Sequence, residues 1–457
     1  MIARESPLRE ALRLSWPATL ALLLHSGYRV NDQYWIQNLG SDAQAALGLC
    51  GFMLIFNFAF VQIGNAGILA RVAHHTGAGN RDQVLSACTS GVGACSLLLV
   101  VVGIIGYFAT PDLVRMLGAS GTVASYSQEY LSQIYICLPL IALKPIVDGI
   151  FIGIGNTMIP LLLAVVSVGL NFVLNPIMIF GWDALGVPAM GVSGAAWATG
   201  ISRGVGGLIG LLMLRRHYQI KILAGRWAWT EVAKIARIGL PVAISTAAYA
   251  GCFIAVLKTS IEAFGSNVQA GLGIGFSGIE VLSYCSLFGP AMAVSGMVGR
   301  RLGAKDHPGA EEAVKICLCL SVGISLAFTA MFLAIPDLLA GIYTSIPAVR
   351  HEVVVYLTIV AWSQIPTAIE AVLARALTGA GRTLGTSIIS AGGYLSRIPL
   401  ALFLGHSIGL GPVGVWWALN ISNYLKLAAI VPLYRREMRI LAALHAVPSN
   451  SATSPSN

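Results

Sequence analysis

The sequence predicts an all-α membrane protein in which twelve transmembrane helices form two pseudo-symmetric lobes of six helices each. Three observations lead to this fold class. The chain of 457 residues is 56% hydrophobic and only 10% charged, apolar segments long enough to cross a bilayer recur along its length, and short motifs of the first half return in the second.

The composition excludes a soluble fold. The charged share is well below the roughly 25% of an average soluble domain, so the chain lacks the charge to cover a surface in water. Mean hydropathy is +0.78. About 256 residues are hydrophobic, and a spanning helix needs roughly 20 of them, which leaves room for about a dozen spans.

Apolar runs bounded by charged or turn residues mark the spans in order. The first run follows Arg4, Arg9 and Arg13 and continues well past the core of a signal peptide, so we expect it to remain a helix. The expected spans cover residues 12–38, 43–68, 85–109, 126–152, 159–181, 189–214, 238–264, 268–297, 313–335, 353–377, 384–405 and 411–434.

The basic residues fix the expected orientation. With the N-terminus in the cytoplasm, the inner segments hold Arg4, Arg9, Arg13, Arg71, Arg81, Arg215, Arg216, Lys221, Arg226, Lys234, Arg237, Arg300, Arg301, Lys305, Arg382, Arg435, Arg436 and Arg439, and the outer loops only Arg115 and Arg350. This asymmetry follows the positive-inside rule and predicts both termini in the cytoplasm of a multi-pass protein of the plasma (bacterial inner) membrane. It also explains the net charge of +9 without a nucleic acid.

The longest internal break divides the chain into two lobes. Residues 1–214 are the predicted first lobe and 238–440 the second, and the basic segment 215–237 between them is a predicted cytoplasmic linker. Trp227 and Trp229 favour an interfacial amphipathic helix in the linker, with an ordinary loop as the alternative. The Ser-, Asn- and Pro-rich end, residues 441–457, is predicted to be a disordered tail.

The two halves share motifs at nearly constant spacing. VAHHTGA at 72–78 recurs as VGRRLGA at 298–304, and GIGNT at 153–157 recurs as GAGRT at 379–383, both 226 residues later. Because each half has six spans, the two copies face the same way, as in repeats related by an axis along the membrane normal. We therefore expect the binding cavity between the two bundles.

Together these segments resemble the multidrug and toxic compound extrusion (MATE) transporters. The resemblance rests on LSWP at 14–17, Asp32 followed by Gly40, GAGN at 77–80, GIGNT at 153–157, NFVLNP at 171–176, GVSGAAWA at 191–198, GLP at 239–241, IE at 279–280, VGRRLGA at 298–304 and ALTGAG at 376–381. It implies a V-shaped pair of six-helix lobes that exports compounds in exchange for Na⁺ or H⁺.

Ionisable groups inside spans are costly, so each is a functional candidate. Asp32 and Asn175 lie at the same expected depth, Asn171 is one turn before Asn175, and Asp148 can approach from the fourth span. This predicted cation-coupling site offers oxygen ligands for Na⁺ or a carboxyl group for H⁺. The alternative is that each acid only neutralises a basic neighbour, Arg29 beside Asp32 and Lys144 beside Asp148.

The sequence departs from the family's pattern at two places. Asn175 stands where one branch has an acid before the fifth-span proline, and Asp148 is the candidate that supplies the missing charge. Another branch has an acid in the seventh span, where this chain has Tyr249. The resemblance therefore favours coupling in the first lobe.

A further set of embedded residues is expected to line the substrate cavity or to form structural pairs. It consists of Glu280, Glu370, Tyr249, Arg203 and Arg397. If Arg203 and Arg397 face the cavity, they suit anionic or zwitterionic substrates. If they pair with Asp148 or Glu370, they are structural.

No pattern for catalysis, a cofactor or a structural metal is present, and the eight cysteines lack metal-ligand spacing. The expected metal chemistry is limited to Na⁺ at Asp32. We expect a secondary antiporter that exports small organic compounds in exchange for Na⁺ or H⁺ by alternating access. It is expected to be a monomer among membrane lipids, and neither an enzyme nor a nucleic-acid binder. The alternative from another class is a flippase of a lipid-linked precursor.

Overall fold

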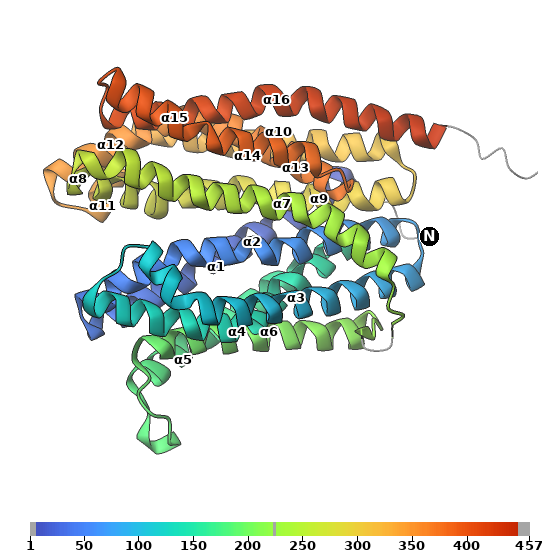
Figure 1. Cartoon of the computed structure of the whole chain (residues 1–457). Coiled ribbons are helices and arrows are strands. Elements are labelled where there is room, and N and C mark those ends of the chain that lie inside the picture. The colour runs from blue at the N-terminus through green and yellow to red at the C-terminus, as the bar shows by residue number, and fades with distance from the viewer. Residues whose placement is uncertain (1–5, 223–224, 447–457) are drawn as a thin grey trace, which may run out of the picture.

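The computed structural model describes residues 6–222 and 225–446, and about 90% of these residues are helical. Within these ranges it contains no β-strand, only an isolated antiparallel bridge between Trp182 and Val187. The first half of the chain, blue to green, forms one bundle, and the second half, light green to red, forms another beside it (Figure 1).

Six helices make the first lobe. They are α1 Pro7–Ile36, α2 Ser41–Gly77, α3 Arg81–Met116, α4 Gly121–Ile154, α5 Met158–Phe180 and α6 Gly191–His217. Side chains such as Ser6 and Asn80 cap the starts of α1 and α3 by accepting hydrogen bonds from Arg9 and Gln83 backbone N–H groups.

The second lobe repeats this order with more interrupted helices. Its segments are α7 Trp229–Val256 with η4 Leu257–Ile261 and η5 Glu262–Phe264, α8 Ser266–Leu272 with η6 Gly273–Glu280 and α9 Val281–Gly303, α10 His307–Ala334, the short α11 Pro336–Tyr343, α12 Pro347–Val360 with η7 Ala361–Ser363 and α13 Gln364–Gly379, α14 Leu384–Leu395 with α15 Arg397–Ala401 and η8 Leu402–Ser407, and α16 Pro412–Ala446. The interruptions η4, η6 and η8 are π-helical turns.

Ten helical segments of the described chain are long and apolar enough to cross a membrane. The less apolar α1 and α16 have 30 and 35 residues and pack within the bundle. The predicted all-α membrane protein with twelve helices in two lobes is therefore confirmed.

The repeated motifs form matching turns. Gly155 and Gly381 follow α4 and α13 with φ of 95° and 72°, a left-handed conformation that glycine adopts without a steric penalty. Gly79 and Lys305 occupy the other repeated turn with φ of 69° and 60°. Only the first copy of that turn has glycine. Lys305 therefore adopts a left-handed conformation that is energetically unfavourable for a residue with a Cβ atom.

The linker and tail are shorter than predicted. Residues 215–217 continue α6, and residues 229–237 already belong to α7. The connecting chain lies along α3, where Thr89 donates a hydrogen bond to the Ile222 carbonyl and Ser90 accepts one from the Ala228 N–H. Hydrogen bonds between α3 side chains and the linker backbone thus take the place of the expected interfacial helix in the described part of the linker. Residues 441–446 continue α16, and the rest of the predicted tail lies outside the described residues.

We call the end of the bundle at which α1 begins and α2 and α9 end the basic end, because Arg71, Arg300 and Arg301 lie there. Glycines bring the lobes into close contact at this end. A Cβ at Gly77 would lie 1.8 Å from the Arg300 carbonyl oxygen, and one at Gly303 would lie 2.0 Å from the His74 carbonyl oxygen. These glycines occupy equivalent positions in the two repeats. The C-terminal ends of α2 and α9 therefore pack directly against each other.

Ion pairs reinforce the same contact. Glu10 of α1 accepts hydrogen bonds from Arg300 at 2.8 Å and from Arg301 at 3.0 Å. Arg71 of α2 binds Glu231 of α7 at 2.8 Å. All three pairs join one lobe to the other, so the lobes are closed against each other at the basic end.

Candidate functional site

The candidate coupling site surrounds Asp32, which is only 6% exposed where α1 packs against α5 and α6. Asn175 of α5 donates a hydrogen bond from Nδ2 to Asp32 Oδ1 at 2.7 Å. Thr199 of α6 donates from Oγ1 to Asp32 Oδ2 at 3.4 Å. Both carboxyl oxygens are thus held by neutral donors inside the first lobe.

Asn171 and Asn31 extend this site as a hydrogen-bonded network. Asn31 Nδ2 donates to Asn171 Oδ1 at 2.9 Å, and Asn171 Nδ2 donates to Thr199 Oγ1 at 3.3 Å. Asn175 Oδ1, by contrast, is buried and has no hydrogen-bond partner within the described chain. An unsatisfied buried acceptor costs free energy, so this oxygen is available to a proton donor.

The structure brings together three of the four residues of the predicted coupling site. Asp32, Asn171 and Asn175 belong to one network, whereas Asp148 forms an ion pair with fully buried Lys144 at 2.7 Å. Asp148 makes no hydrogen bond with the network among the described residues. The i, i+4 spacing on α4 lets Lys144 reach it first, as the alternative interpretation anticipated.

Arg29 is not the partner of Asp32. Arg29 is exposed and Asp32 is buried, and no ion pair joins them in the described chain. Arg203 of α6 instead interacts electrostatically with both Asp32 and Asp148. Its guanidinium lies 4.5 Å from the centre of the Tyr28 ring, a cation–π contact that accommodates the charge.

Asn31 and Thr199 are members of the network that the sequence analysis did not identify. Their positions in the sequence could have indicated them, because Asn31 directly precedes Asp32 and Thr199 directly follows the motif at 191–198. Uncharged polar residues are common in transmembrane helices, so their positions alone did not distinguish them.

The embedded acids of the second lobe have separate partners. Glu280 accepts hydrogen bonds from the Tyr356 hydroxyl and, at 3.3 Å, from Gln364 Nε2. Glu370 accepts one from Ser390 at 2.9 Å and lies 3.7 Å from Lys426 Nζ.

The expected pairs of Arg203 and Arg397 with Asp148 and Glu370 do not form. Asp148 pairs with Lys144 and Glu370 pairs with Lys426, because the two lysines lie nearer to these acids. Arg397 instead donates to neutral acceptors, Ser422 Oγ at 2.8 Å and Asn423 Oδ1 at 2.9 Å.

Tyr249 lies beside Arg397 rather than near the coupling network. Its ring meets that of Tyr394 edge-on at 5.0 Å, and the Arg397 guanidinium lies 5.1 Å from the centre of the Tyr394 ring. The seventh-span position that the resemblance singled out is thus part of an aromatic and basic site.

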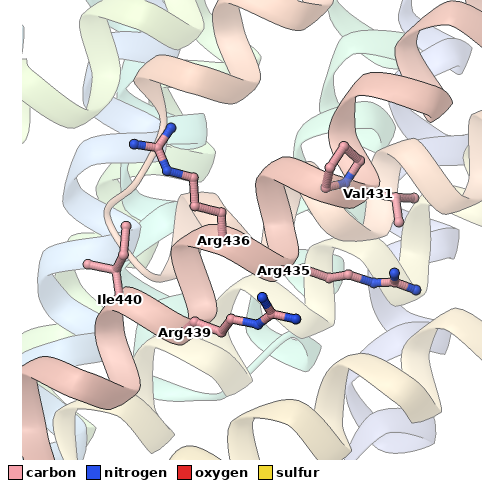
Figure 2. Close-up of a pocket in the computed structure, with 6 residues that line it drawn as sticks. Val431, Arg435, Arg436, Arg439 and Ile440 are labelled. Atoms are coloured by element: carbon pink, nitrogen blue, oxygen red, sulfur yellow. The ribbon is translucent and has the colours of Figure 1, made fainter.

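A separate cavity of about 420 Å³ lies on α16 at the basic end. Figure 2 shows the Arg435 and Arg439 side chains extending to the same side of the helix beside it. Its lining residues are Val431, Pro432, Arg435, Arg436, Arg439 and Ile440. No group of three or more His, Cys, Asp or Glu residues in the described chain has the geometry of a metal site.

Similarity to known proteins identifies the family. The family model described as MatE matches residues 17–177 and 241–403, one stretch in each lobe. The probable multidrug resistance protein NorM of Thermotoga maritima is 26% identical over 415 residues, which cover 89% of this chain and 88% of that protein.

Two further comparisons agree. The FAD transporter of Shewanella oneidensis is 24% identical, with 91% of this chain and 92% of that protein covered. A crystal structure of MATE in complex with MaL6 has a TM-score of 0.87 at 23% identity and covers 96% of this chain and 98% of its own. The chain is a multi-pass membrane transporter and not an enzyme, and it belongs to the MatE family of multidrug and toxic compound extrusion proteins.

Proposed function

We propose that this protein is a secondary antiporter that exports small organic compounds in exchange for H⁺, with Asp32 as the coupling group. The observation that carries the proposal is a buried carboxyl group within a network of neutral hydrogen-bonding side chains. An ionisable acid inside a membrane span is costly, and such residues mark ion and proton pathways. Family membership supports export of drug-like compounds, without a cofactor.

The named relatives favour transport of soluble compounds over lipid flipping. One is named for multidrug resistance and the other for FAD transport. The flippase alternative has no such support.

We infer that the protein lies in the bacterial inner membrane as a monomer among lipids, with the basic end and both termini in the cytoplasm. The positive-inside rule supports this orientation. The lobes meet at the basic end through Glu10 and Arg300 and through Arg71 and Glu231. In this orientation the structure is closed to the cytoplasm, as in the outward-facing state of alternating access.

Several features favour H⁺ over Na⁺ at Asp32. A hard cation such as Na⁺ needs several oxygen atoms that direct lone pairs toward it. Here Asn175 and Thr199 direct donors at the carboxylate, and Arg203 adds a positive charge nearby. A proton needs only one carboxyl oxygen, so this environment suits it better.

Protonation changes what Asp32 can bond. A carboxylate only accepts hydrogen bonds, whereas a carboxylic acid also donates one. The unpartnered Oδ1 of Asn175 is the acceptor that an amide rotation would turn toward the new O–H. Proton binding would thereby rearrange the contact between α1 and α5, which links protonation to the conformation of the first lobe.

The test is dye efflux from cells that lack their own drug pumps and express the Asp32→Asn variant. Asp112→Asn is the matched control, since Asp112 is an exposed acid that pairs with Arg115. We expect Asp32→Asn to lose efflux at equal membrane abundance and Asp112→Asn to keep it. Efflux by Asp32→Asn equal to that of the unmodified protein would remove Asp32 from the mechanism.

A further inference from the structure

Tyr249, Tyr394 and Arg397 form a basic–aromatic cluster in the second lobe, and Arg29 of the first lobe interacts with it electrostatically. Tyr249 of α7 is within electrostatic range of both Arg29 and Arg397. Arg29 comes from α1, so this interaction joins the two lobes. Tyr249 is about 30 Å along α7 from its start at the basic end, which places the cluster deep within the spans.

Arg29 of α1 interacts electrostatically with the second lobe. It is exposed, and its electrostatic neighbours Tyr249 and Cys285 belong to α7 and α9.

The two arginines, Arg29 and Arg397, are not neutralised by a direct ion pair in the described chain. Arg397 binds Ser422 and Asn423 through Nε and Nη2, and its Nη1 has no hydrogen-bond partner among the described residues. Both of its acceptors are neutral, so the positive charge remains uncompensated by contact.

The embedded acids form no ion pair with either arginine in the described chain, and Glu280 interacts with Arg397 only at longer range. Asp148 is held by Lys144 and Glu370 by Lys426. Glu280 is bound by the neutral Tyr356 and Gln364 side chains. An unpaired guanidinium inside a membrane protein is costly, and a bound anion would remove that cost.

Aromatic rings continue from the cluster to the first lobe. Tyr249 lies 6.4 Å from Phe253, whose ring stacks on Phe276 at 5.2 Å and lies 6.1 Å from Phe52 of α2. Aromatic side chains of this kind bind planar rings through stacked and edge-on contacts. The arginines beside them supply bidentate donors for carboxylate or phosphate groups.

We propose that the basic–aromatic cluster binds an aromatic anion, a planar ring system bearing a carboxylate or phosphate group, as a transported substrate. The proposal rests on the transport function proposed above and specifies its substrate class. The ring packs against Tyr249 and Tyr394, and the anionic group binds Arg397 from the second lobe and Arg29 from the first. The ligand thus contacts both lobes, whose relative movement changes its affinity.

The test is binding of three fluorescent probes to the purified full-length protein in detergent. Flavin mononucleotide is the aromatic anion, riboflavin is the same ring without phosphate, and ethidium is an aromatic cation. We expect flavin mononucleotide to bind at least about tenfold more tightly than riboflavin, which corresponds to about 1.4 kcal/mol. We expect Arg397→Gln and Arg29→Gln each to reduce that preference severalfold.

Two controls separate charge from folding. Arg397→Lys keeps the charge and is expected to retain part of the preference, and Arg115→Gln changes an exposed arginine outside the cluster. Equal binding of the two flavins, no flavin binding, or a preference that both glutamine variants retain would overturn the proposal. None of these results would affect the expectation that dye antiport depends on Asp32. Failure of this proposal is therefore distinguishable from failure of the proposed transport function.

Discussion

Glu10→Gln is expected to open the contact between the lobes at the basic end. Glu10 is the one acid of α1 within reach of both Arg300 and Arg301 of α9, at 2.8 and 3.0 Å. Glutamine has nearly the same size, so the substitution removes the charge while keeping the packing. Two interlobe ion pairs are weakened together.

The burial of these side chains sets the magnitude. The three side chains are 15–20% exposed, between a surface pair and a buried one. Surface pairs contribute about 0–1 kcal/mol, and losing one partner of a buried pair costs about 3–5 kcal/mol. Arg300 also keeps its hydrogen bonds to the Ile152 and Gly153 carbonyls at 3.3 Å. We therefore expect a loss of about 1–2 kcal/mol, a shift of about tenfold toward states open at the basic end.

Double electron–electron resonance spectroscopy, which measures the distance between two spin labels, reports this opening. Asp82→Cys and Glu312→Cys place labels on exposed positions of the two lobes near the basic end, in a background carrying Cys319→Ser because Cys319 is the exposed one of the cysteines that the structure describes. We expect the closed distance to dominate without further substitution and a longer distance to gain population in Glu10→Gln.

Asp337→Asn is the matched control, because the pair of Asp337 with Arg350 lies within the second lobe. It is expected to leave the label distances unchanged. An unchanged distance distribution in Glu10→Gln would refute the reasoning that these ion pairs hold the lobes closed, and an equal change in Asp337→Asn would show a general loss of stability instead.

Three further substitutions test the site and the fold. Thr199→Val removes a hydrogen bond to Asp32 worth about 1 kcal/mol and is expected to lower dye transport severalfold, whereas Thr199→Ser retains it; equal transport by both variants would contradict this. Lys305→Gly relieves a left-handed conformation at φ 60° and is expected to raise stability by about 1 kcal/mol, seen as a higher Tm in detergent; an unchanged or lower Tm would count against strain there. Gly303→Ala places a Cβ against the His74 carbonyl and is expected to lengthen the label distances as Glu10→Gln does, while unchanged distances would show that the helices separate without cost.

The fold could be predicted from the sequence because a bilayer leaves the backbone few options. Long apolar runs must form helices, and their number, the basic asymmetry and the repeat at 226 residues agree with one another. The breaks within the second-lobe spans could not be predicted, since π-helical turns such as Gly273–Glu280 depend on packing between helices. The path of the linker along α3 depends on tertiary hydrogen bonds to Thr89 and Ser90 for the same reason.

Part of the candidate site followed from helix geometry alone. Equal depth along two helices brought Asp32 and Asn175 into contact, and the turn spacing placed Asn171 beside them. The partners of the arginines depended on side-chain direction between helices, which one sequence does not contain. For that reason Lys144 and Lys426, rather than Arg203 and Arg397, occupy the embedded acids Asp148 and Glu370.

Transport in liposomes under imposed gradients tests proton coupling at Asp32 most directly. Purified protein and its Asp32→Asn variant are reconstituted, and uptake of flavin mononucleotide, riboflavin and ethidium is followed with either a pH gradient or a Na⁺ gradient at fixed membrane potential. We predict that the pH gradient drives accumulation of at least one dye, that the Na⁺ gradient does not, and that Asp32→Asn abolishes the effect. Accumulation driven by Na⁺ alone, or pH-driven accumulation that persists in Asp32→Asn, would contradict the account.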